Sequence, residues 1–499
     1  MARSIPAEDS MHAPSRTRTA RASHTSRRRW YPPELRSEAV TQVGRLIEDE
    51  GEARSRAISR VATELDIGRE SLRTWVRKAE AEGSTLRVSD TRHTTASGAR
   101  LTVMRDRLPE EEPQGEAEQA PRPRWQRPLA AYLASRLAML IVVELAASHP
   151  GRGLVALPKG FVNWPAVTSG SRFLNALGVW DAGWYVHIAT HSYSPPPLVP
   201  SPLGGDMAFF PLFPLLVRAV AFATGLSPLA AGALLAVVTG MTATLAVWSL
   251  AAHIAGDRVA DRVAVLWCFF PAAFVLSLVY AEGLTVTCAA VCLLMLMRGR
   301  WVVAGLAAAA AGASQPAALV LVACCTWAAA GAIRNQRRWP ALSAPLLAPT
   351  GALAYFGYLW ARTGDPLAWF DSQRLFWNHQ RMGPYWTVIQ PVVRLFQSPG
   401  LLDNTVLVAG LVFAIGAGLA LWRWRPPAIL SIWAAGVMAL ALMSAPVGTR
   451  PRFLFVAFPL IFALAVRMGR RTYYTAVALS VPLFGALTYL TITTLAAVP

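Results

Sequence analysis

The residues of this chain that could do chemistry begin with Asp181, a carboxylate set between Trp180 and Trp184. The segment lies outside any long apolar run and comes shortly before the apolar stretch that begins at Met207. When a hydroxyl attacks the anomeric carbon of a sugar, a single carboxylate within hydrogen-bond reach can take the proton that the hydroxyl loses. Aromatic rings beside that acid offer flat surface to a sugar. The pattern therefore predicts Asp181 as a general base.

Ordinary structural roles compete with this interpretation. Asp181 could instead cap a helix or be a solvated loop charge, and Trp residues gather at membrane interfaces whatever the function. His187 and His191 stand four residues apart, which permits a shared helix face and metal binding, but such a pair is more often structural. The sequence alone leaves these alternatives open.

The composition of the chain indicates a membrane protein. It is 54% hydrophobic and only 15% charged, with a mean hydropathy of +0.37, which is too apolar for an ordinary soluble domain. Most of the net charge of +18 falls after residue 127, where arginines beside apolar runs hold loops on the cytoplasmic side. The five cysteines lie in apolar segments without Cys or His partners at zinc-ligand spacing, which argues against disulfides and zinc.

The elements that must position Asp181 are membrane helices. A span needs about 20 apolar residues, and arginines recur in alternate loops, so the positive-inside rule puts the N-terminus in the cytoplasm and the loops 148–227 and 362–403 outside. Segment 206–218 contains two prolines and an arginine, so we expect an amphipathic surface helix there rather than a span. The eleven predicted spans are 128–147, 228–252, 262–280, 283–298, 301–314, 317–333, 341–361, 404–422, 427–445, 452–467 and 473–496.

With this topology the scarce acids of the membrane part fall mostly on one side. Asp257 and Asp261 lie among cytoplasmic arginines, whereas the other acids fall at or near the outer face. Such one-sided acids, together with the tryptophans of the two large outer loops, suit a sugar and its hydroxyls. The predicted outer acids are Glu144, Asp181, Asp206, Glu282, Asp365, Asp371 and Asp403.

Several motifs follow one another in a fixed order in this part of the chain. They are Trp180-Asp181, His187-Ile188-Ala189, Tyr193, Ala208-Phe209-Phe210-Pro211-Leu212-Phe213-Pro214, Ser277-Leu278-Val279-Tyr280-Ala281-Glu282, Gly364-Asp365-Pro366-Leu367-Ala368, Gln373 and Trp377. In this order they resemble the GPI mannosyltransferase II (PIG-V) family and its actinobacterial relatives, over about residues 128–499. One departure is Ser314-Gln315-Pro316, where the resemblance leads us to expect an Arg-Pro pair, so a contact of that arginine is missing or supplied elsewhere.

The resemblance implies an all-α GT-C fold of about 11 transmembrane helices in the cell membrane. It also implies an active site on the extracytoplasmic face and a polyprenyl-phosphate sugar as donor, with a lipid or glycan as acceptor. By similarity, Asp181 would be the catalytic carboxylate. The residues that we assign to substrate binding are Trp180, Trp184, His187, Asp206, Glu282, Asp365, Gln373, Trp377, Arg450 and Arg452.

The chemistry of such a transfer explains the need for an arginine. A lipid phosphate leaves with its negative charge, so it needs a cation more than an acid, and the guanidinium of Arg450 or Arg452 suits phosphate geometry. Anchoring to lipid headgroups is the competing role for these two residues. One catalytic carboxylate is then enough, unlike the pair of glycoside hydrolysis. We expect an inverting mannosyltransferase; the acceptor, the hexose and the participation of a divalent metal stay open.

The first 127 residues are a separate region. The apolar spacing from Ala57 to Lys78, with Gly68 in the turn, predicts a helix-turn-helix, and residues 27–83 resemble the DNA-binding part of insertion-sequence transposases. DNA is therefore a candidate partner of residues 27–83. Residues 1–26 and 84–127 are predicted to be disordered. The alternative is an appendage without function, produced by gene fusion or by an early start codon, with Met104 as a sensible start for the transferase.

Two other classes of function compete with a transferase over residues 128–499. A transporter would place polar groups in the middle of its spans, and here the spans are clean apart from Arg136 and the break at Gln315. A membrane-tethered DNA-binding regulator would use residues 27–83 as its working part and the spans as a sensor. We rank both below the transferase.

Overall fold

The computed structural model describes residues 33–48, 53–65, 67–81, 125–148, 169–194, 205–377, 383–397, 402–444 and 448–494. Every regular element in these ranges is helical and none is a strand, so the predicted all-α class is confirmed. The chain divides into two compact units, Met1–Gln114 and Gly115–Pro499. The predicted disordered tail 1–26 and most of the predicted linker 84–127 lie outside the described residues.

The first unit contains three helices, α1 (Pro33–Glu48), α2 (Arg54–Glu64) and α3 (Arg69–Ala81). Gly68 stands directly before α3, as the predicted helix-turn-helix requires. Amphipathic helices of this length are stable when they bury their apolar faces against one another. The buried apolar residues that they share all come from this unit, among them Val43, Ile58, Val61, Leu72 and Val76.

The second unit contains five helical stretches that are long and apolar enough to cross a membrane. With shorter apolar helices beside them, they make the chain a multi-pass membrane protein. Much of their surface is apolar and exposed, as expected of helices that face lipid. The five are α4 (Gln126–Ser148), α8 (Pro228–Ala255), η3 (Pro316–Leu319) with α12 (Val320–Gln336), α17 (Leu402–Trp424) and α21 (Arg470–Thr493).

Shorter helices fill the rest of this unit. They are α5 (Arg172–Leu177), α6 (Ala182–His191), η1 (Asp206–Ala208), α7 (Leu212–Thr224), α9 (Asp257–Cys268), η2 (Ala273–Leu276), α10 (Glu282–Met297), α11 (Trp301–Gly312), η4 (Trp339–Leu342), α13 (Ser343–Leu347), α14 (Thr350–Thr363), α15 (Ala368–Phe376), η5 (Tyr385–Ile389), α16 (Gln390–Gln397), α18 (Ala428–Met443), α19 (Pro451–Val456) and α20 (Pro459–Arg467).

Three predicted spans are not continuous helices. The predicted span 262–280 ends as a helix at Cys268, the span 452–467 is divided between α19 and α20, and the span 341–361 is divided among η4, α13 and α14. Prolines explain these breaks, because proline lacks the N–H of the helical hydrogen bond and disfavours helical backbone at the residue before it. Pro271, Pro349 and Pro459 stand at the three breaks.

The helix that was predicted at 206–218 also differs from its prediction. A single turn, η1, covers Asp206–Ala208, and α7 then runs from Leu212 to Thr224. Both prolines of the segment fall at the start of α7, where proline is tolerated. The helix is amphipathic, since it buries Phe213 and Val217 and exposes Leu215 and Phe222.

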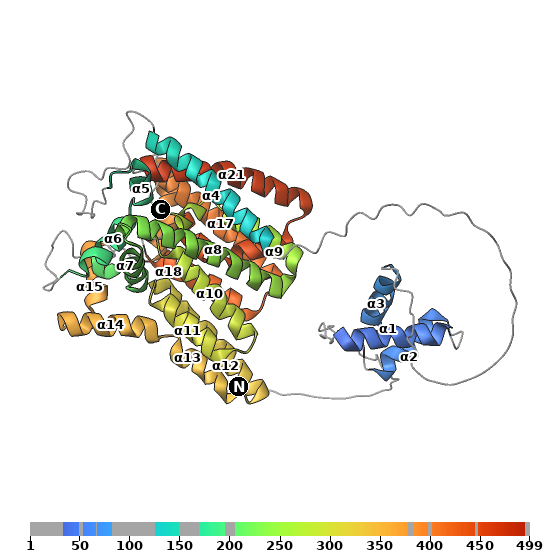
Figure 1. Ribbon diagram of the computed structural model, residues 1–499. Helices are drawn as coiled ribbons and strands as arrows, with labels where there is room; N and C mark the ends of the chain where they lie inside the picture. Colours follow the sequence, from blue (N-terminus) through green and yellow to red (C-terminus); the bar gives the residue numbers. More distant parts are fainter. Residues whose placement is uncertain are drawn as a thin grey trace, which may run out of the picture. The chain divides into compact units, whose positions relative to one another are not determined.

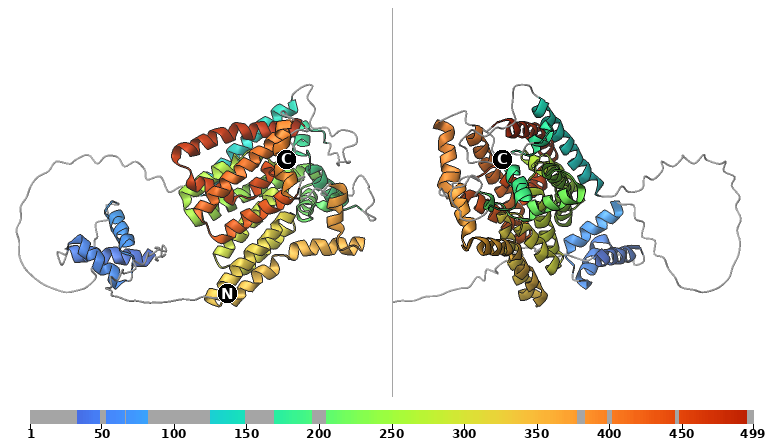
Figure 2. Two further views of the ribbon diagram at one scale, coloured as in Figure 1. Left: turned by 180° about the vertical axis from the view of Figure 1, so that it is seen from behind. Right: turned by 60° about the vertical axis from the view of Figure 1, so that its left-hand side comes forward.

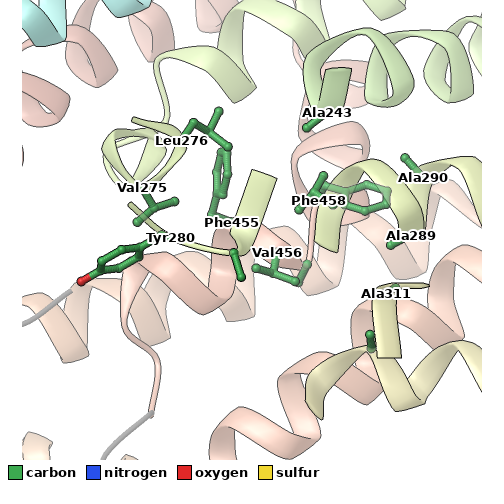
Figure 3. Close-up of a cluster of buried hydrophobic side chains, with 14 of the residues drawn as sticks. Ala243, Val275, Leu276, Tyr280, Ala289, Ala290, Ala311, Phe455, Val456 and Phe458 are labelled. Atoms are coloured by element: carbon green, nitrogen blue, oxygen red, sulfur yellow. The ribbon is translucent and has the colours of Figure 1, made fainter. Parts of the chain in front are cut away.

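Some of the short helices gather at one end of the second unit. Figures 1 and 2 show α5, α6, α7 and α15 together at this end, with α4 and α8 running away from it toward α9. The broken segment 269–281 lies in the core, where Val275 and Leu276 are fully buried and Trp267 stacks on Phe455 at 4.4 Å. Figure 3 shows Tyr280 at the edge of this apolar cluster, with its hydroxyl directed away from it.

Arg136 of α4 holds the broken segment in place. Its guanidinium donates to the carbonyl oxygen of Ala273 at 2.8 Å and to Oγ of Ser277 at 2.9 Å, and it lies 5.3 Å from the ring centre of Tyr132. Non-helical backbone at membrane depth is stable only when other groups satisfy its carbonyls. This buried arginine does so for the carbonyl oxygen of Ala273, which gives it a structural role.

Replacing Arg136 by Met is expected to destabilise the membrane unit. The substitution removes the donor to Ala273 and Ser277, and each buried acceptor left without a partner costs about 1–3 kcal/mol. Thermal unfolding in detergent should show a lower midpoint for Arg136→Met. Ser277→Ala, which removes only one of the acceptors, is the control and should have a smaller effect. An unchanged midpoint for Arg136→Met would contradict this role.

Candidate active site

Asp181 occupies the first position before α6, yet it does not cap the helix. Its side chain makes no capping hydrogen bond. The preceding residue, Trp180, has φ of 59°, a left-handed conformation that is unfavourable for a bulky side chain. Its indole Nε1 donates to the carbonyl oxygen of Thr491 at 2.8 Å, and its side chain is buried. The turn is thus fixed to the end of α21, and the helix-cap alternative for Asp181 fails.

The carboxylate of Asp181 takes part in an ion-paired triad with Arg452 and Glu282. The Arg452 guanidinium lies 2.5 Å from Oδ2 of Asp181 through one terminal nitrogen and 2.5 Å from Oε1 of Glu282 through Nε. The side chains of Asp181, Arg452 and Glu282 are 14%, 12% and 1% exposed. Charges this shielded from water attract one another far more strongly than surface charges do. Three motifs that are distant in sequence therefore meet at one point.

Tyr280 joins the triad through both its ring and its hydroxyl. The backbone N–H of Asp181 donates to its hydroxyl oxygen at 3.3 Å, and the Arg452 guanidinium lies over its ring at 5.0 Å from the centre. Tyr280 is fully buried. In the sequence analysis Tyr280 is one residue of a motif and has no assigned role. Its position two residues before Glu282, a candidate acid at the start of a predicted helix, was the sequence feature that could have indicated a role for it.

The local sequence around α19 explains why Arg452 rather than Arg450 joins the triad. Pro451 is the first helical residue, a position that suits its fixed φ, so Arg450 and Arg452 leave the turn in different directions. Arg450 pairs instead with Asp403 of α17, at 2.6 Å. Just before them, Oγ1 of Thr449 donates to the carbonyl oxygen of Leu407 at 2.5 Å. The backbone that leads into α19 is therefore fastened to α17.

Asp206 is fully buried and belongs to a second polar group, separate from the triad. Its Oδ2 accepts the backbone N–H of Ser194 at 2.5 Å. The same stretch is held by Arg362 of α14, which donates to the carbonyl oxygen of Tyr193 at 2.7 Å. Burial raises the pKa of Asp206 from its ordinary value of 3.8, and the hydrogen bond from Ser194 opposes that effect. Its observed contacts fasten the chain after α6 to η1.

The raised pKa of Asp206 gives a prediction for stability against pH. Because the folded state has the higher pKa, the proton favours folding, and this contribution is lost as the pH rises through the folded pKa. Relative to the unmodified chain, Asp206→Asn is expected to gain stability on going from acid to neutral pH. Asp206→Ala, the control, also lacks the carboxyl, so it should show the same pH-dependent gain, but at each pH it should be about 1–3 kcal/mol less stable than Asp206→Asn because the N–H of Ser194 loses its acceptor. The measurement is thermal unfolding in detergent across this pH range. If the stability of Asp206→Asn relative to the unmodified chain did not rise with pH, the raised pKa of Asp206 would be contradicted.

Two of the tryptophans predicted to meet substrate lie in an aromatic cluster beside α6. Trp184 is fully buried, with Phe209 stacked on it at 5.9 Å and Trp377 tilted against it at 6.0 Å between ring centres. Trp377 of the segment after α15 is only partly buried, and its Nε1 donates to the carbonyl oxygen of Gly205 at 3.0 Å. In this structure Trp184 supports α6, and Trp377 is the more accessible ring.

The remaining predicted site residues lie apart from the triad's ion pairs. Oδ1 of Asp365 accepts the N–H of Leu367 at 2.8 Å, which makes a local turn before α15. Gln373 is half-buried on α15. His187 stacks on His191 at 4.9 Å, and burial, followed by the charge of His191, lowers the pKa of His187. Within the described ranges no group of three or more His, Cys, Asp or Glu side chains is arranged to hold a metal ion.

Comparison with known proteins gives two family matches. The model of the mannosyltransferase (PIG-V) family matches residues 154–334, which contain Asp181 and Glu282, and a transposase family model matches residues 25–109. Both resemblances predicted from the sequence are therefore confirmed over these ranges. No curated protein matches the chain.

Solved membrane glycosyltransferases are similar at low identity. ArnT from Cupriavidus metallidurans bound to undecaprenyl phosphate is 13% identical, with a TM-score of 0.41 over 70% of this chain and 61% of ArnT. The Archaeoglobus fulgidus oligosaccharyltransferase in complex with Zn and sulfate is 16% identical, with a TM-score of 0.39 over 70% of this chain and 53% of that one. This chain thus spans about half to three fifths of these chains. Over residues 154–334 it is similar to the mannosyltransferase (PIG-V) family, and that is the family to which its sequence points.

Proposed function

We propose that this protein is a membrane glycosyltransferase that transfers a hexose from a polyprenyl phosphate to a hydroxyl of a lipid or glycan. Mannose is the hexose that we propose. The observation that carries the proposal is the triad of Asp181, Arg452 and Glu282, which joins the residue before α6 to the first turns of α10 and α19. The match of residues 154–334 to the mannosyltransferase family supports the choice of sugar.

In the proposed reaction Asp181 is the general base. Its carboxylate takes the proton of the acceptor hydroxyl as the hydroxyl oxygen bonds to the anomeric carbon. On the opposite face, the bond from the anomeric carbon to the phosphate oxygen breaks, and the electron pair leaves with the polyprenyl phosphate. A single displacement of this kind inverts the configuration at the anomeric carbon.

The charges of the triad suit this reaction. Two carboxylates face one guanidinium, so one negative charge within the triad is not balanced by Arg452. A fixed negative charge in a shielded site stabilises the positive charge that develops on the sugar in the transition state. Arg450 is as shielded as Arg452, at 11% and 12% exposed, but Arg452 lies between two shielded acids, whereas Arg450 pairs with Asp403, which is 38% exposed. This difference leaves Arg450 as the better of the two candidates for the leaving phosphate.

We further propose that the active site faces the extracytoplasmic side. Arg127 of α4 pairs with Asp261 of α9 at 2.7 Å, and Arg262 donates to the carbonyl oxygen of Met468 after α20 at 3.4 Å. Three of the arginine-rich loops thus meet at one end of the membrane unit, and Figure 1 shows the helices α5, α6 and α7 at the other. The positive-inside rule assigns the arginine-rich end to the cytoplasm.

The donor can be tested with membranes from cells that make the protein. Labelled mannose on polyprenyl phosphate is expected to be transferred to an endogenous lipid or glycan, whereas nucleotide-linked mannose, with synthesis of the lipid donor blocked, is not. Labelled glucose on the same lipid tests whether the enzyme distinguishes mannose from another hexose. Transfer from the nucleotide donor alone would overturn the proposed donor class. Absence of transfer from any lipid-linked hexose would overturn the transferase.

Removing residues 1–114 is expected to leave transfer activity unchanged within about twofold. Among the described residues, the buried apolar core of the membrane unit is made of residues of that unit alone. A domain with its own core can fold alone. The measurement is the same transfer assay on both forms at equal membrane content. A membrane-tethered DNA-binding regulator, the competing function, would lose its function altogether.

A further inference from the structure

Glu282 is the most buried of the three triad residues. Its side chain is 1% exposed, compared with 14% for Asp181, and it is the first residue of α10, where the helix dipole favours a negative charge. The next residue, Gly283, fixes the start of this helix, because a Cβ there would lie 2.8 Å from Oγ1 of Thr239 and 2.9 Å from the backbone nitrogen of Gly240. Close packing of α10 on α8 thus fixes the backbone from which the Glu282 side chain extends.

Arg452 connects this fixed carboxylate to Asp181. Its Nε faces Glu282 and one of its terminal nitrogens faces Asp181. A guanidinium is planar and rigid, so fixing its position at one nitrogen also fixes the position of the other. The rings of Tyr280 and Phe453 lie 5.0 Å and 5.1 Å from the guanidinium carbon and limit its tilt.

From this geometry we propose that Glu282 and Arg452 are positioning residues that hold the carboxylate of Asp181, and that Glu282 does not touch the substrate. The inference rests on the proposed function, in which Asp181 is the base. It replaces the expectation that Glu282 and Arg452 bind substrate directly. It also accounts for the missing Arg-Pro pair: Gln315 stands there and lies beside Glu282, while the cation comes from α19.

The test separates kcat from KM. Glu282→Gln keeps the shape of the side chain but removes the charge that holds Nε, while Arg452 and Asp181 still neutralise each other, so the variant should fold. A catalytic group displaced by about 1 Å loses roughly a hundredfold in rate. We expect kcat to fall by that order with KM for the donor and the acceptor unchanged. Arg452→Lys, which keeps the charge but not the rigid fork, should behave in the same way.

A double-mutant cycle distinguishes the outcomes. If Glu282 acts only through Arg452, Glu282→Gln should add no further loss in the Arg452→Lys background, because contacting residues are non-additive. Glu282→Asp, with a shorter arm, should recover part of kcat. A raised KM for the lipid donor in either single variant, or full additivity in the double variant, would overturn the positioning role. Full activity of Asp181→Asn would instead remove Asp181 as the base, and absence of transfer by the unmodified chain would overturn the proposed function itself.

Discussion

Replacing Asp181 by Asn is expected to lower kcat for sugar transfer by about 10²–10⁴-fold, the usual contribution of a general base. Asparagine has nearly the same shape as aspartate but cannot accept the acceptor's proton. KM values should change little, because the base contacts the reacting hydroxyl only as its proton is transferred. The measurement is transfer from labelled polyprenyl-phosphate mannose in membranes that contain equal amounts of each variant.

The charge balance of the triad makes this variant informative. The unmodified triad has two carboxylates and one guanidinium, so Asp181→Asn leaves Arg452 and Glu282 as a one-to-one pair and should not unfold the protein. By contrast, removing Arg452 would leave two shielded carboxylates without a cation, a change that typically costs about 3–5 kcal/mol. Asp371→Asn is the matched control, since it makes the same change at a half-buried acid of α15. Equal activity of Asp181→Asn and Asp371→Asn would remove Asp181 from the mechanism.

The membrane class and the main long helices could be predicted because they depend only on apolar length. The positions at which helices are interrupted could not be predicted in the same way. Residues 262–280 form one apolar run with a single proline, and a hydropathy scan counts such a run as a span. In the structure the helix ends at Cys268, and the freed carbonyl of Ala273 is satisfied by Arg136 from α4. That contact joins residues 137 positions apart, which local sequence does not contain.

The candidate site shows the same division between local and long-range information. The motif order identified Asp181 and Glu282 as candidates, and the need for a cation at the leaving phosphate identified Arg450 or Arg452. Neither argument predicts that one guanidinium bridges the two acids. The choice between Arg450 and Arg452 depends on where α19 begins and on its contact with α17. The burial of Trp184 depends on Phe209 and Trp377. Each of these facts is a tertiary contact, whereas the spacing of residues reports only neighbours along the chain.

A methyl group added at Gly410 is expected to reduce kcat at least about a hundredfold without changing any residue of the triad. A Cβ on this residue of α17 would overlap the carbonyl oxygen of Thr449 and lie 3.1 Å from its carbonyl carbon. Backbone atoms cannot turn aside as the end of a side chain can, so the loop before α19 must move away from α17. That loop leads into α19, which carries Arg452. Movement of Arg452 would shift Asp181, and displacement of a catalytic group by about 1 Å costs roughly a hundredfold in rate.

Gly416→Ala on the same helix is the control for Gly410→Ala. No atom lies within 4 Å of a Cβ built at Gly416, and alanine favours a helix over glycine by about 1 kcal/mol, so this variant should keep full activity and melt no earlier than the unmodified chain. Activity is compared per amount of folded protein, measured as the monodisperse fraction in detergent, so that loss of fold is not counted as loss of rate. Because Gly410→Ala leaves Asp181, Glu282 and Arg452 unchanged, a selective fall in its kcat would mean that the position of the α19 loop, and not only its residue types, sets the rate. Equal rates for the two alanine variants would show that contact with α17 does not hold the triad in its working geometry.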